Sequence, residues 1–298
     1  MAKKRIDIII GVIISLSFLF FLFILVIALT GLNLEEGYYF HGFGKKVAVI
    51  EIYGSINYSD DIIRQLKKYT RDSSIPAIVL DINSPGGGVA SSQEIYEEVL
   101  KVKDEGKKVV ASLRSVGASG AYYIACAADT IVANPGTLTG SIGVIFEFPV
   151  VQELFKKIGL KFEVVKSGDL KEIGTWNRDM TPEEKNLLQS VIDDSYDQFV
   201  DAVVEGRGLP QEQVLEIADG RIFTGRQAME LGLIDEMGNL EDAIMIAGKI
   251  GGIEGIPKSI KEKTKSDTLI DLLSGSLKSL LNLRTDDNLS PKLQYIFK

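Results

Sequence analysis

The sequence predicts an α/β fold built on a mainly parallel sheet and preceded by one membrane-spanning helix. Strand-like and helix-like segments alternate about every 30 residues, as right-handed crossover connections require. One of the strands, Ala77–Ile82, is almost continuously apolar, which suits a strand buried on both faces of a parallel sheet. The membrane helix is predicted from an uncharged stretch at residues 8–32.

The N-terminal region is expected to be a retained membrane anchor. Residues 8–32 exceed the roughly 20 residues that cross a bilayer, and they are longer than the apolar core of a cleaved signal peptide. Basic residues at 3–5 precede this stretch and acidic residues at 35–36 follow it. By the positive-inside rule, residues 1–7 are expected in the cytoplasm and the rest of the chain outside the cell membrane.

Composition excludes several functional classes. The 298 residues are 45% hydrophobic and 25% charged, which fits one large domain with an appendage. The net charge of −8 argues against nucleic acid as a partner. A single cysteine, Cys126, allows no intrachain disulfide and is expected to be a packed core thiol. A single histidine, His41, lies in the linker, so we expect neither a Ser-His-Asp triad nor a metal site, and no cofactor.

The first half of the predicted domain, which follows a linker at residues 33–46, alternates strands with helices. Its strands are Val47–Tyr53, Ala77–Ile82, Lys108–Leu113 and Thr130–Ala133. Its helices are Ser59–Arg71, Ser91–Asp104 and the alanine-rich run after Ser119. This order predicts a sheet whose strands point the same way, with helices as the connections.

The second half is richer in loops. A helix near Val151–Ile158 and a strand at Lys161–Val165 are expected first. Thr181 then opens a long helix to about Glu205, because Pro182 occupies the first helical position and glutamates follow in the first turn. Two further helices are expected at Ile222–Leu233 and Asn239–Lys249, which completes a domain predicted at residues 47–256.

The predicted tail, residues 257–298, carries an apolar stripe. Leucines recur every four residues at 269, 273, 277 and 281, which predicts an amphipathic helix. Such a helix needs a partner surface on its own core, on a second copy or on the membrane.

Ser119 is the candidate nucleophile. It lies between small residues where the third predicted strand passes into a helix. Small neighbours let a substrate carbonyl approach, and the first amides of a helix have no partner within it and can hold an oxyanion. A serine at this position can equally be a helix cap, so this segment alone leaves both interpretations open.

The turn Ser84-Pro-Gly-Gly-Gly88 follows the buried strand and precedes a helix. Successive glycines allow a ligand to touch the main chain, and the amide of Gly120 is a natural second donor to an oxyanion. The turn is neither a dinucleotide fingerprint nor a P-loop, because the spacing of both is missing. A peptide could bind beside these glycines as an added strand.

A base for Ser119 is expected to be a lysine, since histidine is nearly absent. An amine can take the proton of a serine only when the amine is neutral. Lowering the pKa of a lysine to near 7 requires that its ammonium form be destabilised by about 4–5 kcal/mol. Lys166 and Lys171 are the candidates, because their segment contains few other charges. They are five residues apart, and side-chain direction alone does not choose between them.

Four sequence pieces occur in an order that resembles the signal peptide peptidase A family, in its short single-copy form. They are S-P-G-G-G, G-A-S-G-A-Y-Y-I-A, T-G-S-I-G-V and K-S-G-x-x-K-E, and with the spacing between them the match covers about Val47–Lys249. The resemblance implies a Clp/crotonase-type fold with a repeated ββα core. It also implies a membrane-anchored endopeptidase that cleaves remnant signal peptides and assembles into a homo-oligomeric ring.

The resemblance also implies roles for individual residues. Ser119 would be the nucleophile and Lys171 the general base. Gly86 and the amide of Gly120 would form the oxyanion hole, and Ser141 would orient the lysine. The family's Ser and Lys can come from adjacent subunits.

The sequence departs from the family pattern at Ala121, where a glycine is often found, and at residues 174–177, where a Ser-Pro pair is common. Three alternatives remain at this point. One is a Ser-Lys membrane protease that acts on stomatin-like partners. Another is a crotonase-like acyl-CoA enzyme that uses a carboxylate such as Glu147. The third is a non-catalytic scaffold with the same fold.

Overall fold

The structure is a computed structural model of the chain that describes residues 15–22, 44–262 and 293–296. Residues 15–22 are helical and fall inside the predicted membrane span. In the parts of the chain so described, no helix has both the length and the apolar character needed to cross a bilayer. The other residues of the predicted span, and the amphipathic helix predicted at residues 269–281, lie outside the described residues.

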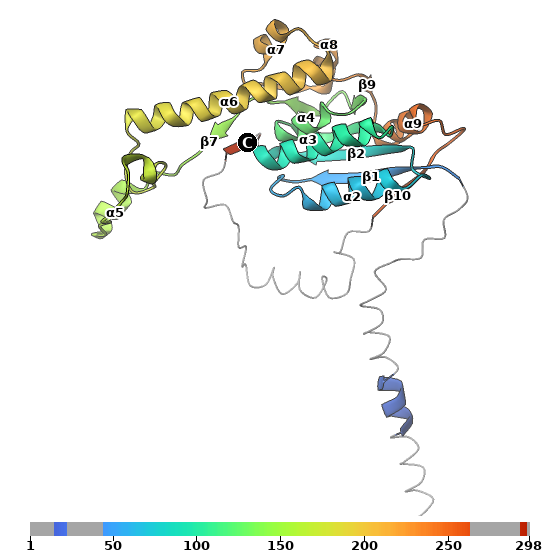
Figure 1. The fold of residues 1–298 in the computed structure, drawn as a ribbon, viewed down its shortest axis with the longest axis horizontal. Helices are drawn as coiled ribbons and strands as arrows, with labels where there is room; N and C mark the ends of the chain where they lie inside the picture. The colour runs from blue at the N-terminus through green and yellow to red at the C-terminus, as the bar shows by residue number, and fades with distance from the viewer. Residues whose placement is uncertain (1–14, 23–43, 263–292, 297–298) are drawn as a thin grey trace, which may run out of the picture. The chain divides into compact units, whose positions relative to one another are not determined.

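The main sheet has eight strands, and all but one of its pairings are parallel (Figure 1). Its path runs β10-β1-β2-β4-β5-β9, while β6 pairs with the end of β4 and carries β8 antiparallel beside it. The strands are β1 (Lys46–Tyr53), β2 (Ala77–Ser84), β4 (Lys108–Ala118), β5 (Thr130–Ala133), β6 (Leu138–Gly140), β8 (Ile222–Thr224), β9 (Glu236–Met237) and β10 (Lys258–Lys261). The predicted α/β class with parallel strands is confirmed.

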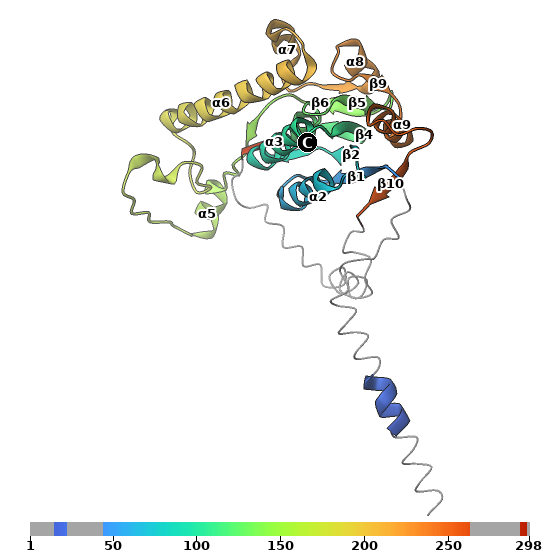
Figure 2. The same ribbon diagram turned by 45° about the vertical axis from the view of Figure 1, so that its right-hand side comes forward.

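Helices cover both faces of this sheet. Figure 2 shows α2 and α3 on one side of the strands and α9 on the other. Successive residues of β1 point to opposite faces of the sheet and belong to two separate hydrophobic clusters. Ile50 belongs to the larger cluster and Val49 to the smaller one, as the two-residue period of a strand requires. The helices of this unit are α2 (Asp60–Arg71), α3 (Val89–Asp104), α4 (Gly120–Ala125), α5 (Gln152–Ile158), α6 (Pro182–Arg207), α7 (Gln211–Ile217), α8 (Gly225–Glu230) and α9 (Leu240–Ile250).

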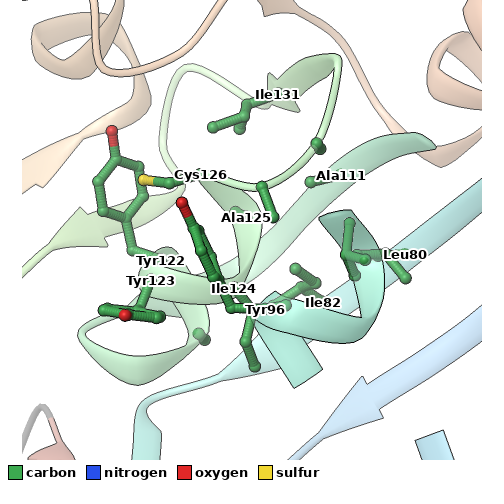
Figure 3. Close-up of a cluster of buried hydrophobic side chains, with 14 of the residues drawn as sticks. Leu80, Ile82, Tyr96, Ala111, Tyr122, Tyr123, Ile124, Ala125, Cys126 and Ile131 are labelled. Atoms are coloured by element: carbon green, nitrogen blue, oxygen red, sulfur yellow. The ribbon is translucent and has the colours of Figure 1, made fainter. Parts of the chain in front are cut away.

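The larger cluster packs α4 against the sheet (Figure 3). Leu80 and Ile82 of β2 lie on the same side as Ile124 of α4, and all three are fully buried. The Tyr122 hydroxyl donates to the carbonyl oxygen of Leu233 at 2.7 Å. The Cys126 side chain is buried in this cluster, so the prediction of a packed core thiol is confirmed, and burial raises the pKa of the thiol to about 12.

A second, three-stranded sheet lies at the end of the first, in the order β3-β11-β7. Its strands are β3 (Gly86–Gly88), β11 (Leu293–Ile296) and β7 (Ile145–Phe146), and both pairings are antiparallel. The glycine turn predicted after β2 therefore contains a short strand. Both β10 and β11 come from the segment predicted as a tail, and they pair with β1 and β3 respectively.

The segment between β7 and α6, which we call the arm (residues 147–181), carries α5 and a short 3₁₀ helix, η1 (Asp169–Glu172). The strand predicted at Lys161–Val165 is wrong, because these residues form no regular structure. Strand propensity expresses how well a segment packs beside neighbouring strands, and the arm offers none at this point. In Figures 1 and 2 the arm projects beyond the sheet.

Two helices begin at capping residues that hydrogen-bond the first turn of the helix. The Thr181 hydroxyl accepts from the Glu184 amide and the Glu184 carboxylate accepts from the Thr181 amide, so the predicted cap of α6 is confirmed. A second capping box at Thr224 and Gln227 starts α8 at Gly225. The helix predicted from Ile222 therefore begins three residues later than expected, and Ile222–Thr224 forms β8.

We predict that Gly206→Ala lowers the free energy of unfolding by about 1–3 kcal/mol, as overpacking of a core does. A methyl group at Gly206 of α6 would lie 2.2 Å from the carbonyl oxygen of Cys126, and neither backbone can move away alone. Chemical denaturation of the two proteins measures the difference. Gly136→Ala is the control, because a methyl group there meets no atom within 4 Å. An equal decrease in the free energy of unfolding in both variants would contradict the close contact between α6 and α4.

Candidate active site

Three of the predicted site residues lie at the same edge of the main sheet. Ser119 directly follows β4, Ser141 directly follows β6, and Gly86 lies two residues beyond the end of β2. Residues Ala118 and Gly140 are paired in the ladder between β4 and β6, and the Ser119 amide donates to the Gly140 carbonyl at 2.7 Å. Parallel pairing thus brings together residues that are far apart in the sequence.

Ser119 and Ser141 share an unusual backbone conformation. Their φ angles are 54° and 52°, and within the described part of the chain they are the only non-glycine residues with positive φ. Such a conformation costs on the order of 1–3 kcal/mol and persists only where its surroundings impose it. Ser119, with ψ −123°, sits on a sharp turn from strand to helix, the local geometry that presents the nucleophile in many serine hydrolases.

The Ser119 side chain is buried but makes no hydrogen bond. The residue is 1% exposed, and its Oγ has no hydrogen-bond partner among the described residues. It also does not cap α4, so the interpretation of Ser119 as a simple helix cap is not supported. A buried hydroxyl without a partner costs about 1–3 kcal/mol, and a group of this kind calls for a functional explanation.

The main chains of Gly86 and Gly120 converge beside Ser119. A methyl group at Gly86 would lie 2.7 Å from the Gly120 amide nitrogen and 2.1 Å from the Tyr295 carbonyl oxygen of β11. The φ of Gly86 is +99°, so a side chain is excluded by both space and backbone conformation. In this structure the Gly86 amide donates to the Ser84 hydroxyl at 3.1 Å.

Ser141 lines a cavity of about 670 Å³ that contains acidic side chains. Asp193 of α6 and Asp219 belong to its wall. The hydrogen bond from the Arg221 side chain lowers the pKa of Asp219 to about 2, so this carboxylate is ionised at neutral pH. The Ser141 amide donates to the Arg221 carbonyl at 2.8 Å, which ties the serine to the same loop. The Arg221 guanidinium lies 2.6 Å from the Asp219 carboxylate, so the charge of this carboxylate is offset by its ion pair.

Both candidate lysines lie on the arm, away from the sheet edge. The Lys166 amine donates to the Asp169 carbonyl oxygen and pairs with the Glu172 carboxylate, each at 3.1 Å. Lys171 belongs to η1 and is exposed, and its amine makes no hydrogen bond or ion pair with another described residue. Because the Oγ of Ser119 has no partner, the single chain joins it to neither lysine.

Sequence reasoning did not anticipate one residue at this site. Tyr295 of β11 is fully buried, stacks on Tyr123 and lies with its carbonyl beside Gly86 and Gly120. The residues around Tyr295 contain no recognisable motif. The sequence predicted only that some peptide strand could pair beside the glycines, without indicating this one.

Comparison with known proteins identifies the family. Residues 101–252 match the family model of peptidase family S49, and residues 45–135 match that of Clp protease. A putative protease of the cyanobacterium Synechocystis is 42% identical over 84% of this chain and 91% of its own length.

Two further relatives carry more specific names. A putative signal peptide peptidase SppA of Enterococcus faecium is 39% identical over 62% of this chain and 54% of that protein. The chloroplastic serine protease SPPA of Arabidopsis thaliana is 35% identical over 77% of this chain and 34% of that protein. These matches do not favour the stomatin-directed or acyl-CoA alternatives. The chain therefore belongs to peptidase family S49, the signal peptide peptidase A family, and is a serine peptidase with a Clp-protease-like α/β fold.

Proposed function

We propose that the protein is a membrane-anchored endopeptidase that cleaves remnant signal peptides with a Ser119–Lys171 dyad. The observation that carries the proposal is Ser119 itself. Its backbone is held in a strained turn between β4 and α4, and its buried hydroxyl has no partner among the described residues. Backbone strain and an unpaired hydroxyl of this kind are typical of a catalytic nucleophile before its base and substrate bind.

In the proposed reaction, the neutral Lys171 amine takes the proton of Ser119 as the Oγ attacks the scissile carbonyl. The amides of Gly120 and Gly86 then stabilise the oxyanion. For this the Gly86 amide must exchange its hydrogen bond with Ser84, or share it. The protonated lysine next gives its proton to the leaving amine, and an acyl-enzyme remains. A water molecule, deprotonated by the same lysine, attacks the acyl carbon. The bond from this carbon to the Ser119 Oγ then breaks, the lysine returns the proton to Oγ, and the acid is released.

The contacts of the two lysines support Lys171 over Lys166 as the base. Lys166 neutralises Glu172, whose carboxylate also lies 3.6 Å from Arg178. The Lys166 amine would therefore have to leave its contacts with Glu172 and Asp169 before it could reach another site. Lys171 has no such partner among the described residues, so its amine is available to another site.

We propose that the arm of one copy carries Lys171 to the Ser119 of a neighbouring copy in a homo-oligomeric ring. The arm is built around a small aromatic cluster of Phe155, Phe162 and Trp176, with ring centroids 4.8–5.1 Å apart. It leaves many apolar side chains exposed, a pattern that favours a protein partner. They include Leu154, Ile158, Leu160, Phe162, Val164, Val165 and Trp176.

The membrane anchor and the substrate class are proposed from the sequence and from a relative. The anchor is proposed at residues 8–32 from the uncharged run and its basic flank, with the catalytic domain outside the cell membrane. Signal peptides are proposed as substrates because a relative bears the name signal peptide peptidase. An anchored peptidase would meet such apolar peptides where they are released.

We predict that Ser119→Ala abolishes peptide cleavage and covalent labelling by an acylating serine-hydrolase probe. The wild-type protein should gain the mass of one acyl group per chain, measured by intact-protein mass spectrometry. Lys166→Ala should still be labelled, which controls for general damage to the protein. A Ser119→Ala protein that retains labelling would assign the nucleophile elsewhere.

We predict that Lys171→Ala and Lys171→Arg lower kcat/KM by at least about 1,000-fold, whereas Lys166→Ala keeps activity within about 5-fold of the wild type. An amine base acts only after losing its proton, so the wild-type rate should rise with pH. A guanidinium does not deprotonate in this range, which is why arginine fails. The rates are measured with a fluorogenic peptide from pH 6 to about 10.

Mixing experiments test whether the dyad is shared between copies. Co-assembly of Ser119→Ala chains with Lys171→Ala chains should restore activity, because some interfaces then combine an intact Ser119 with an intact Lys171. Two inactive proteins that stay inactive after verified co-assembly would mean that each dyad forms within one chain. Activity of the isolated Lys171→Ala protein, with loss in Lys166→Ala, would reverse the assignment of the base.

We predict that protease added outside sealed cells digests the chain beyond about residue 33, because the catalytic domain is proposed to face outward. A tag fused before residue 1 should stay protected, and immunoblotting of both ends measures this. Permeabilised cells provide the control in which both ends are digested. Protection of the catalytic domain in intact cells would refute the proposed topology.

A further inference from the structure

A row of four charged side chains, which we call the ion-pair chain, runs from the arm to the first turn of α6. The Glu172 carboxylate of η1 lies 3.1 Å from the Lys166 amine and 3.6 Å from the Nε of Arg178. The two terminal nitrogens of Arg178 donate to the Glu184 carboxylate of α6 at 2.6 and 2.8 Å. Positive and negative groups alternate along this row, so Arg178 joins a carboxylate of η1 to a carboxylate of α6.

Glu184 is the fixed end of the ion-pair chain. The residue is 2% exposed, and its carboxylate also accepts from the Thr181 amide at 2.8 Å in the capping box of α6. The hydrogen bonds from Arg178 lower the pKa of Glu184 to about 2, so the carboxylate is ionised at neutral pH. Two parallel hydrogen bonds between a guanidinium and a carboxylate fix orientation as well as distance. Arg178 is therefore held in one position at the start of α6.

The short helix η1 depends on outside contacts for its orientation. It is a single turn of four residues, none of which is buried, and Lys171 within it is exposed. A turn of this length is unstable by itself, because few hydrogen bonds offset the ordering of its backbone. The loop after η1 is tied to the start of α5, since the Val151 amide donates to the Trp176 carbonyl at 2.8 Å. That contact stays within the arm, whereas the path from Glu172 through Arg178 leads to α6.

Helix α6 connects the ion-pair chain to the part of the domain that carries Ser119. Figure 1 shows α6 reaching from the arm to the helices that cover the main sheet. The Phe199 ring of α6 lies 5.1 Å from the Tyr123 ring of α4, and the Tyr123 amide donates to the Ser119 carbonyl at 2.8 Å. Glu184 precedes Phe199 by 15 residues, which is about 22 Å along an α-helix. Arg178 is therefore tied to this framework but remote from the Ser119 of its own chain.

We propose that Arg178 is a positioning residue for the base. By holding Glu172 against Glu184 it fixes η1 in one orientation, and so aims the Lys171 amine at the serine that it serves. The proposal rests on the proposed role of Lys171, and it gives Arg178 no contact with the substrate or the reacting atoms. A guanidinium suits this position because its nitrogens bind two carboxylates at once, whereas a lysine offers a single amine. Lys166 contacts Glu172 from within the arm, so its removal leaves the link to α6 in place.

Removal of the guanidinium should slow the chemical step without changing the binding of substrate. We expect Arg178→Ala to lower kcat at least about 30-fold and to change KM less than about 3-fold, because a base misplaced by about 1 Å can cost about 100-fold in rate. Arg178→Lys should recover only part of this loss. The control is Lys156→Ala, which removes an ion pair with Glu153 on α5 of the same arm and should keep kcat within about 2-fold of the wild type. A fluorogenic peptide measures the rates, and light scattering verifies that the variants assemble as the wild type does.

A double variant separates positioning of the base from a general contribution to stability. Lys171→Ala protein has no amine to aim, so the addition of Arg178→Ala should change the residual rate of Ser119 acylation less than about 2-fold. With Lys171 intact, the same change should lower that rate at least about 30-fold. A reactive acylating probe, followed for hours by intact-protein mass spectrometry, gives all four rates. A residue that only stabilised the fold would lower the rate by the same factor in both backgrounds.

Glu172→Gln covers the case in which Arg178→Ala does not fold. It keeps the size of the side chain and removes the charge that Arg178 and Lys166 bind. We expect it to lower kcat at least about 10-fold, and to add nothing to the loss in Lys171→Ala protein. Near-wild-type kcat in each of these variants that folds, or losses that multiply with the loss from Lys171→Ala, would overturn the proposal. Wild-type activity of Lys171→Ala itself would instead refute the proposed function.

Discussion

The parallel pairing of β4 with β2 on one side and with β6 on the other is the constraint on which the site depends. It places the residues that follow three strands at one edge, with Ser84 opposite Gly117 and Ala118 opposite Gly140. The turn after β4 is then held at both ends: the Ser119 amide donates to Gly140, and its carbonyl accepts from the Tyr123 amide. Two fixed hydrogen bonds leave Ser119 little choice of backbone conformation, which explains its positive φ.

This geometry has an energetic cost that the rest of the domain must offset. Two strained serines and one unpartnered hydroxyl together cost several kcal/mol by ordinary magnitudes. The offset comes from the large hydrophobic cluster beneath α4, where the Ala-rich helix and the β2 and β4 side chains are fully buried. Helix α4 can approach so closely because its first residues are small, and the contact of Gly206 with Cys126 extends the same close packing to α6.

Within one chain the predicted nucleophile and oxyanion donors lie together, whereas the predicted base lies on the arm. The glycines, Ser119 and Ser141 are positioned within one chain, and β11 pairs with β3 beside them. The arm that carries Lys171 stands apart, with its own aromatic cluster and an apolar surface. The proposed sharing of the dyad between copies would make activity depend on assembly, because a lone chain would hold Ser119 without Lys171 beside it.

Local sequence patterns predicted many of the strands and helices of this protein. The apolar runs and their spacing predicted the parallel strands, the Thr181 signal predicted the start of α6, and the small residues around Ser119 predicted a strand-to-helix turn. The strand expected at Lys161–Val165 failed, because a strand needs a neighbour and the arm lies outside the sheet. Only the tertiary structure decided that Ser141 lies beside Ser119 and that Tyr295 lies beside Gly86 and Gly120. Contacts between residues more than about 20 positions apart depend on sheet register and chain path, and no local periodicity encodes these.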